Sequence, residues 1–233
     1  MSGQMFSVKG LESGYGQSQV IYDLSFDVAK KEIVAVMGRN GMGKTTLFKT
    51  LMGVLPAFGG SIEVDGKALD GLDTYRRVQE GIAYVPQGRM IFSHMTVLEN
   101  IQTGLPSSAK GIVPEELYAL FPVLFDMRAR KGGNLSGGQQ QQLAIARALA
   151  TNPKVLLLDE PTEGIQPSII KDIAKSLREI RELRDLTIIV SEQVLSFTLD
   201  IADRFFVIDK GKFVYENQRA NVDEKVISRY LSI

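Results

Sequence analysis

The segment Gly38–Thr46, which reads GRNGMGKTT, has the glycine spacing of a phosphate-binding loop. It follows the apolar run Ile33–Met37 and precedes Leu47–Met52, an order that predicts a buried strand, a glycine loop and a helix. Glycines let the backbone turn successive N–H groups inward, and the start of a helix adds partial positive charge. We expect a nucleoside triphosphate here, with Lys44 on the β- and γ-phosphates and the Thr45 hydroxyl on Mg²⁺. The nucleotide-binding residues would be Gly38, Arg39, Asn40, Gly41, Met42, Gly43, Lys44, Thr45 and Thr46. The alternative is an ordinary glycine turn with Lys44 in solvent.

Two acids follow a second apolar run. Asp159 and Glu160 come directly after Val155–Leu158, so both carboxylates emerge where a buried strand reaches the edge of a sheet. If that strand neighbours the phosphate-loop strand, Asp159 can hold Mg²⁺ through water and Glu160 can polarise the attacking water. The alternative is a pair of acids at a helix start after Pro161, stabilised by the helix dipole.

A second candidate phosphate contact lies at Ser136-Gly137-Gly138-Gln139, which has the S-x-x-Q spacing of a capping box. A well-capped helix is therefore the simplest interpretation. Two glycines in a first helical turn disfavour the helix by ~1 kcal/mol each relative to alanine. They are useful if an anion approaches the bare backbone N–H groups, which predicts ATP gripped from two sides.

A sheet must position these groups. The sequence predicts antiparallel strands within residues 5–28, a strand at Ile82–Val85 that ends at Pro86-Gln87-Gly88, and a helical block from about Arg89 to Ala150. The other expected elements are strands at Ser61–Lys67, Val155–Leu158, Thr187–Ser191, Arg204–Ile208 and Lys212–Tyr215, and helices at Ser168–Arg184, Val194–Ala202 and the C-terminus.

We therefore expect a single α/β domain over residues 1–233. Residues 1–88 would form an antiparallel β subdomain plus the phosphate-loop part of the core, 89–152 a helical subdomain, and 153–233 the remaining core with a C-terminal hairpin and helix.

Composition narrows the class of protein. The formal net charge is zero and 44% of the 233 residues are hydrophobic, which disfavours a nucleic-acid binder and fits a globular protein. Cysteine is absent, so disulfides and thiolate metal sites are excluded. No apolar run approaches the ~20 residues of a membrane-spanning helix, and no secretory signal pattern is present, so we expect the protein to serve a membrane, if at all, from the water side.

The motifs GRNGMGKT, YVPQ, LSGGQ and VLLLDEPT occur in this order, and together they resemble the nucleotide-binding domain of ABC transporters over essentially the whole chain. The stretches MGRNGMGKTTLFKTLMG, YVPQGRMIF, LSGGQQQQLAIARALA and DEPTEGIQPSIIKDI are most similar to ATP-binding subunits of branched-chain amino acid importers, and closest to their urea-importing relatives. The resemblance implies a P-loop NTPase with a RecA-like core, an N-terminal antiparallel β subdomain and an inserted helical subdomain.

The resemblance also implies roles for single residues. Two such domains would pack head to tail, each ATP lying between one phosphate loop and the partner's Ser136, Gly137, Gly138 and Gln139. Tyr15 would stack on adenine, the alternative being a tyrosine buried in a turn. Gln87 would sense Mg²⁺ and the attacking water, with an ordinary polar turn after Pro86 as the alternative. The loop from Gly88 to Asn100 would contact a membrane permease.

Two departures from the family pattern bear on catalysis. Gln193 stands where most ABC ATPases place a histidine against the γ-phosphate, and the only histidine, His94, is expected at a surface or contact position. An amide can donate a hydrogen bond but cannot carry a proton as imidazole does, so we expect Gln193 to orient and Glu160 to be the principal catalytic group. The segment Glu163–Pro167 lacks the aspartate that the wider family often has there, which leaves its contacts across a dimer open.

The resulting prediction is an ATPase subunit at the cytoplasmic face of a bacterial inner membrane, peripheral, with Lys44, Mg²⁺ and a partner's helix end neutralising charge. Its expected partners are a second and different ATPase subunit, two permeases and, indirectly, a substrate-binding protein, for uptake of urea or a branched-chain amino acid. The alternative function is a nucleotide-gated clamp on a soluble complex. The apolar residues Met90, Ile91 and Phe92, expected to be exposed, favour a permease contact.

Overall fold

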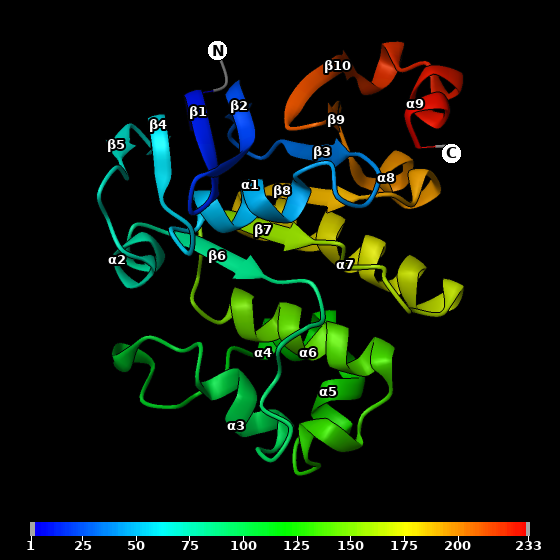
Figure 1. The fold of residues 1–233 in the computed structure, drawn as a ribbon. Coiled ribbons are helices and arrows are strands. Elements are labelled where there is room, and N and C mark those ends of the chain that lie inside the picture. The colour runs from blue at the N-terminus through cyan, green and yellow to red at the C-terminus, as the bar shows by residue number, and fades with distance from the viewer. Residues whose placement is uncertain (1–2, 232–233) are drawn as a thin grey trace.

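A largely parallel sheet carries the phosphate loop at the carboxyl end of one of its inner strands (Figure 1). The structure is a computed structural model that describes residues 3–231. The sheet has the order β10-β9-β3-β8-β7-β6, parallel except for the β9–β10 pair. Its strands are β3 (Ile33–Met37), β6 (Ile82–Val85), β7 (Val155–Asp159), β8 (Thr187–Glu192), β9 (Arg204–Asp209) and β10 (Lys212–Gln218).

Strand β7, which ends in Asp159, does not neighbour β3. Strand β8 lies between the two, so the expectation that the strand before Asp159 is a direct neighbour of the phosphate-loop strand is wrong. The register pairs Asp159 with Ser191 and Met37 with Glu192, so the end of β8 joins the acid-bearing strand to the phosphate-loop strand. The carboxyl ends of all three strands therefore meet at one edge, where ligands of open α/β sheets bind.

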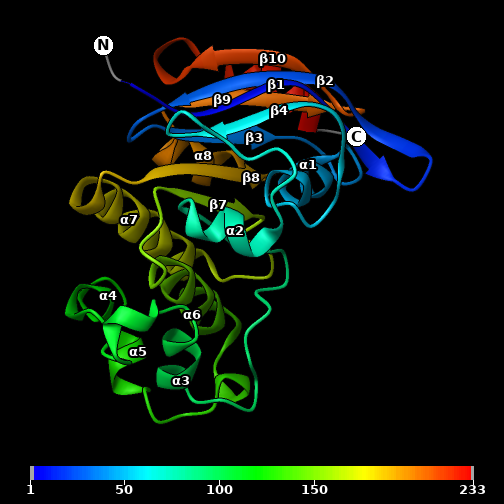
Figure 2. The ribbon, with the colours of Figure 1, turned by 90° about the vertical axis from the view of Figure 1, so that its left-hand side faces the viewer.

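A second, antiparallel sheet of order β2-β1-β4-β5 lies over the first, with helix α1 (Lys44–Leu51) between them (Figure 2). Its strands are β1 (Gln4–Tyr15), β2 (Ser18–Ala29), β4 (Ala57–Val64) and β5 (Lys67–Ala68). The expected short strands of this region are continuous strands of 12 residues each, β1 and β2, because register shifts let them bend without breaking. Buried residues of β1, β2 and α1 share one apolar core with the upper face of the parallel sheet.

Helices between β6 and β7 form a separate group at the lower end of Figure 1. They are α3 (Val97–Gln102), α4 (Glu115–Leu120), α5 (Pro122–Asp126) and α6 (Gly137–Leu149). Thr96 and Ser136 begin α3 and α6, and Glu99 and Gln139 follow them by three residues. This spacing predicts a capping box, and the box is complete in both helices. The buried residues of this group share a core with the lower face of the parallel sheet, so α6 is held firmly against it.

The remaining helices are α2 (Thr74–Gln79), α7 (Pro167–Arg184), α8 (Leu195–Ile201) and α9 (Glu224–Leu231), and short 3₁₀ turns occupy Ser107–Ala109, Gly132–Asn134 and Arg219–Asn221. In α7, Ile173, Leu177 and Ile180 are buried at helical spacing. Within residues 3–231 no helix has the length and apolar character needed to span a bilayer. The division of the chain at 88/89 and 152/153 stays a prediction.

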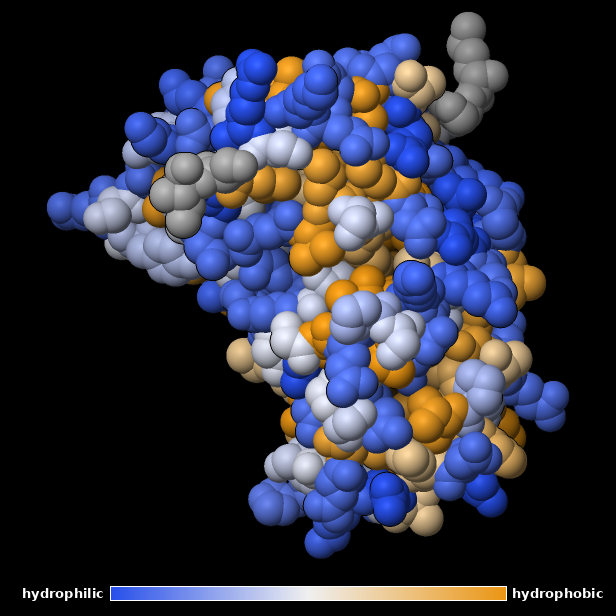
Figure 3. Space-filling view, turned by 90° about the vertical axis from the view of Figure 1, so that its right-hand side faces the viewer, coloured by the Kyte–Doolittle hydropathy of each residue, from blue (hydrophilic) through white to orange (hydrophobic). Residues whose placement is uncertain are grey.

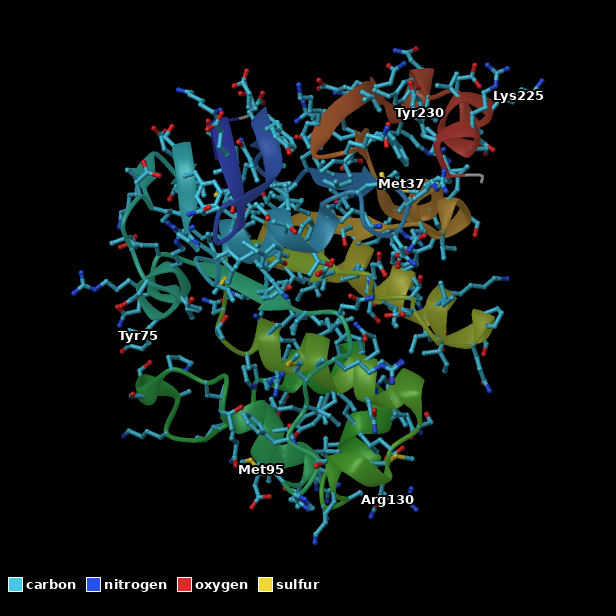
Figure 4. All side chains as sticks on the ribbon, viewed as in Figure 1. Met37, Tyr75, Met95, Arg130, Lys225 and Tyr230 are labelled. Carbon is cyan, nitrogen blue, oxygen red and sulfur yellow. The ribbon has the colours of Figure 1, made fainter. Side chains whose placement is uncertain are left out.

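The labelled side chains of Figure 4 lie in both the sheet part and the helical group of the molecule. In Figure 4, Met37 lies in the upper part at the end of β3, whereas Met95 and Arg130 lie in the helical group below. The parallel strands point toward the right-hand side of Figure 1, which is the face seen in Figure 3. That face is broad in its upper part and narrower below, and hydrophobic residues lie among hydrophilic ones near its middle.

Candidate active site

A cleft of about 460 Å³ opens where the phosphate loop meets the end of β7. It is lined by Tyr15, Val20, Asn40, Gly41, Gly43, Lys44, Thr45, Thr46, Gln87 and Glu160. These residues come from the β1–β2 hairpin, the phosphate loop, the segment after β6 and the segment after β7. The structure thus brings most of the predicted nucleotide residues and one of the two acids into a single cleft.

Glycine is required in the loop for two different reasons. Gly43, the residue before α1, has φ 109°, a value that residues with a Cβ rarely adopt. A Cβ on Gly38 would lie 2.7 Å from the carbonyl oxygen of Ile208 in the neighbouring strand β9. The loop therefore packs tightly on the sheet and leads directly into the start of α1, where backbone N–H groups attract anions.

Lys44 is the most buried cation of this cleft, with a side chain 3% exposed. Its ammonium donates to the carbonyl oxygens of Gly38 at 2.6 Å and Arg39 at 3.0 Å, and it lies 2.9 Å from the Glu160 carboxylate. The alternative of a solvated Lys44 is wrong, because the side chain lies back along its own loop. A buried ammonium whose contacts include a movable side chain is suited to exchange those contacts for phosphate oxygens.

Glu160 is at the centre of a polar network. It follows β7 in a left-handed conformation, with φ 47°, and its side chain is 8% exposed. Its carboxylate accepts from the amides of Gln87 and Gln193, each at 3.2 Å, in addition to the Lys44 contact. The Gln193 amide also donates to Asn40 Oδ1 at 2.7 Å. The structure therefore brings together Lys44, Gln87, Glu160 and Gln193 around one carboxylate.

Asp159 lies behind the cleft and is 1% exposed. Burial raises the pKa of this carboxyl group, and hydrogen bonds from Ser191, Thr45 and Tyr84 oppose the rise. The Ser191 hydroxyl donates at 2.5 Å and the Tyr84 hydroxyl at 3.2 Å. Both the Asp159 carboxylate and the Thr45 hydroxyl therefore sit at the start of α1, where a metal on the phosphates would be.

The donor set here fits Mg²⁺ that arrives with a nucleotide. Hydroxyl, carboxylate and amide oxygens from Thr45, Asp159 and Gln87 are the hard ligands that Mg²⁺ prefers. The described residues contain no group of three or more His, Cys, Asp or Glu side chains that could hold a metal ion.

Tyr15 and His94 are both exposed. Tyr15 is 48% exposed at the tip of β1, with its hydroxyl 3.4 Å from that of Thr46, so the alternative of a buried turn tyrosine is wrong. An exposed ring at the cleft edge is available to stack on a base. His94 lies in the segment between β6 and α3 and does not line the cleft, as expected for a surface or contact residue.

The predicted second phosphate contact lies outside this cleft. Ser136 caps α6 by accepting from the Gln139 backbone N–H, and the Gln139 side chain accepts from Ser136 in return. A Cβ on Gly138 would lie 2.8 Å from Ile169 of α7, so close helix packing gives this glycine a structural reason that the sequence did not suggest. At Gly137 the nearest atoms to an added Cβ belong to the flexible end of Arg89, at 3.2 Å, so helix packing does not require glycine at this position.

Sequence reasoning missed several neighbours of these residues. Glu192 is buried and accepts from both Thr162 and the Gln193 backbone. The Gln87 amide donates to Glu163 at 3.0 Å as well as to Glu160. The signal for Glu192 was an acid directly after the apolar run Thr187–Ser191, the same pattern that drew attention to Asp159.

A groove of about 580 Å³ lies between α2, the segment after β6 and the helical group. It is lined mainly by apolar residues, among which Val54, Met90 and Phe92 are 53%, 70% and 49% exposed. Ile91, expected to be exposed with its neighbours, is instead partly buried against the lower core. Arg147 of α6 lines the groove too, donating to the Met90 carbonyl at 2.8 Å and lying over the Phe92 ring at 5.2 Å.

Comparison with known proteins agrees with this geometry. The family described as ABC transporter matches residues 21–163. The chain is 38% identical over 232 residues to the high-affinity branched-chain amino acid transport ATP-binding protein BraG of Pseudomonas aeruginosa, covering 97% of this chain and 99% of that protein. It is 34% identical over 235 residues to the lipopolysaccharide export system ATP-binding protein LptB of Haemophilus influenzae, covering 97% of each.

The fold has close counterparts among solved structures. An ATP-binding cassette of an ABC transporter, solved in its ADP conformation, superimposes with a TM-score of 0.84 and 26% identity, covering 99% of this chain and 100% of that one. Because the family match and the full-length relatives agree with the cleft around Lys44 and Glu160, the fold is that of an ABC nucleotide-binding domain. The chain belongs to the ABC transporter family as one of its ATPases, and it binds ATP with Mg²⁺.

Proposed function

We propose that this protein is the ATP-hydrolysing subunit of an ABC importer and that it drives uptake of branched-chain amino acids or of urea through membrane permeases. The observation that carries the proposal is the pairing of a complete ATPase cleft with an apolar, partly exposed groove beside it. The full-length similarity to BraG, whose name states branched-chain amino acid transport, supports the amino acid as the first choice of substrate.

The cleft suggests how this chain prepares the triphosphate. Lys44 exchanges the Gly38 and Arg39 carbonyls and the Glu160 carboxylate for oxygens of the β- and γ-phosphates. Thr45, Gln87 and Asp159 would hold Mg²⁺, and Tyr15 would stack on the adenine. When bound, Mg²⁺ neutralises charge on the phosphates. Backbone N–H groups of Gly38–Thr46 surround the phosphates, as the glycine conformations at this loop allow.

Release of Lys44 leaves the Glu160 carboxylate free to polarise the attacking water. Gln87 and Gln193 already donate to this carboxylate and keep it directed into the cleft. The amide of Gln193 bridges Glu160 and Asn40, so it can orient the water and the γ-phosphate without taking up a proton. Hydrolysis in this scheme depends on position and charge, and Glu160 is its principal catalytic group.

A second ATPase subunit completes the scheme. The capped start of α6, with Ser136, Gly137, Gly138 and Gln139, lies outside this chain's own cleft and would meet the triphosphate held by the partner. The partner is proposed to be a different polypeptide, because Gln193 at the usual histidine position resembles one of two distinct subunits in branched-chain amino acid importers.

The groove beside the cleft is the proposed contact with a permease. Its exposed Val54, Met90 and Phe92 form an apolar surface next to Gln87, so a permease bound there would be linked directly to a residue of the ATPase cleft. The protein would then lie at the cytoplasmic face of the bacterial inner membrane as a peripheral subunit, with a substrate-binding protein acting on the far side.

Uptake by cells tests this proposal. A strain lacking the protein should lose uptake of labelled leucine, isoleucine and valine, or of labelled urea, and the parent gene should restore it while the Lys44→Ala variant should not. Tagged protein should co-purify with integral permeases. Normal uptake of all four compounds would refute the import role, and loss of lipopolysaccharide export would instead favour a role like that named for LptB. If the tagged protein instead co-purified only with a soluble complex, the alternative function as a nucleotide-gated clamp would be favoured.

A further inference from the structure

Glu192 is a buried acid that none of the expected roles uses. It is the last residue of β8, it lies directly before Gln193, and it is 2% exposed. An ionised carboxylate removed from water is strongly unfavourable unless it is well hydrogen-bonded. Burial accordingly raises the pKa of Glu192, and hydrogen bonds from Thr162, Val194 and Gln193 oppose that rise.

The two carboxylate oxygens of Glu192 bind two different segments. Oε1 accepts from the Thr162 backbone N–H at 2.9 Å and from the Thr162 hydroxyl at 2.6 Å. Oε2 accepts from the backbone N–H of Gln193 at 2.9 Å and of Val194 at 3.1 Å. One oxygen therefore holds the segment that follows Glu160, and the other holds the segment that carries Gln193.

We propose that Glu192 is a positioning residue that fixes the separation between Glu160 and Gln193. Thr162 lies two residues after Glu160, and the Gln193 amide reaches the Glu160 carboxylate at 3.2 Å. Four hydrogen bonds to one rigidly buried side chain set the distance between the two segments. The inference rests on the roles proposed above for Glu160 and Gln193.

A carboxylate is the side chain that this position requires. It offers two acceptor oxygens, whereas the amide of glutamine offers one acceptor and one donor. In a Glu192→Gln variant, the NH₂ group faces either Thr162 or the two backbone N–H groups of residues 193 and 194, and in both orientations it meets donors. The two segments then shift relative to one another, whereas Lys44 and the phosphate loop keep their own contacts.

The expected effect is on turnover and not on nucleotide binding. Misplacement by about 1 Å of a group that orients a reaction lowers the rate by up to ~10²-fold. We expect Glu192→Gln to lower kcat for ATP hydrolysis by roughly 10- to 100-fold. KM and the Kd for ATP should stay within about twofold of the parent, because the phosphate loop and Lys44 do not contact Glu192.

The test uses the assembled transporter in membranes, with ATP hydrolysis, ATP binding and thermal stability measured for each variant. The control is Glu32→Gln, because Glu32 is also a largely buried carboxylate that accepts from a backbone N–H, that of Ala29, and pairs with Arg204 at the opposite end of β3. The inference is supported if Glu192→Gln has a lower kcat and the parent KM while Glu32→Gln keeps the parent kcat. Parental kcat in Glu192→Gln, or equal losses of kcat and ATP affinity in both variants, overturns it.

Two further variants keep the outcome interpretable. Thr162→Val removes one hydroxyl donor and should lower kcat by a smaller factor even if Glu192→Gln does not fold, and parental turnover in Thr162→Val would count against the inference. Combined with Glu192→Gln, its effect should be less than additive, because both changes alter the same contact between residues 162 and 192. Glu160→Gln is measured in parallel. If this variant hydrolyses ATP at the parent rate, the catalytic role proposed for Glu160 fails. If Glu160→Gln is inactive but Glu192→Gln has the parent kcat, only the inference about Glu192 is overturned.

Discussion

The Glu160→Gln substitution should have two opposite effects, tighter ATP binding and slower hydrolysis. The Glu160 carboxylate lies 2.9 Å from the Lys44 ammonium, and the two side chains are 8% and 3% exposed. ATP must break this contact before Lys44 can bind phosphate. The carboxylate therefore competes with the nucleotide for the same cation.

The magnitude follows from the kind of bond that is exchanged. A hydrogen bond to a charged group contributes about 1.5–3 kcal/mol, and a bond between neutral groups about 0.5–1.5 kcal/mol. Replacing the carboxylate by an amide removes one of the two charges and leaves that of Lys44, so the competing contact weakens from the upper toward the lower end of the charged range, by about 1–1.5 kcal/mol. Since 1.4 kcal/mol is a factor of ten, the Kd for ATP should fall roughly 5- to 10-fold.

Hydrolysis should fall in the same variant. Removal of a positioned general base slows a reaction by about 10²- to 10⁴-fold. The assay pairs equilibrium binding of a fluorescent ATP analogue with release of inorganic phosphate, both with Mg²⁺ and in the assembled transporter.

Glu163→Gln is the matched control. Its carboxylate accepts from the Gln87 amide at 3.0 Å, as that of Glu160 does at 3.2 Å, but it is on the exposed side and does not pair with Lys44. Its Kd for ATP should stay within about twofold of the parent. An unchanged Kd in Glu160→Gln would show that the ion pair does not oppose nucleotide binding, and a parental rate of phosphate release would remove Glu160 from catalysis.

Three other predictions concern separate parts of the molecule. Gly138→Ala should be less stable than Gly137→Ala by about 1–3 kcal/mol in urea unfolding, because only the Cβ at 138 meets a packed helix; equal stabilities would contradict the close packing. Tyr15→Ala should raise the Kd for ATP roughly 2- to 10-fold while Tyr15→Phe leaves it unchanged, if the ring stacks on the base. Hydrogen bonds from the Thr96 backbone N–H and hydroxyl hold the pKa of Glu99 below its ordinary value of 4.5. This contact therefore stabilises the fold above pH 4.5, and its contribution is lost as the pH falls through the lowered pKa. The Glu99→Gln variant should have a lower Tm than the parent at neutral pH and the same Tm in acid.

The elements with the strongest local patterns were predictable from the sequence. The phosphate loop, the buried strand before Asp159 and the capping boxes at Thr96 and Ser136 are set by spacing and residue type within a few positions, so the structure agrees with them. The order of these motifs resembles that of a known family and implied the ATPase function, and the comparisons confirm this function.

Relations between distant segments were not predictable in this way. The insertion of β8 between β3 and β7 depends on sheet topology, which strand patterns alone do not determine. The pairing of Lys44 with Glu160, and the four donors on Glu192, depend on how the ends of separate strands meet in space. An acid after an apolar run indicates a position at a strand end, but its partners become visible only in three dimensions.

The Arg147 contacts join helix α6 to the apolar groove. Arg147 lies near one end of this helix and binds the Met90 carbonyl and the Phe92 ring at the groove, while Ser136 and Gly137 begin the other end. A helix of 13 residues is a stiff rod about 20 Å long. If the groove and the start of α6 have the roles proposed above, a force applied to Met90 or Phe92 would be transmitted along this one rigid element to Ser136 and Gly137, so that the two surfaces would respond together.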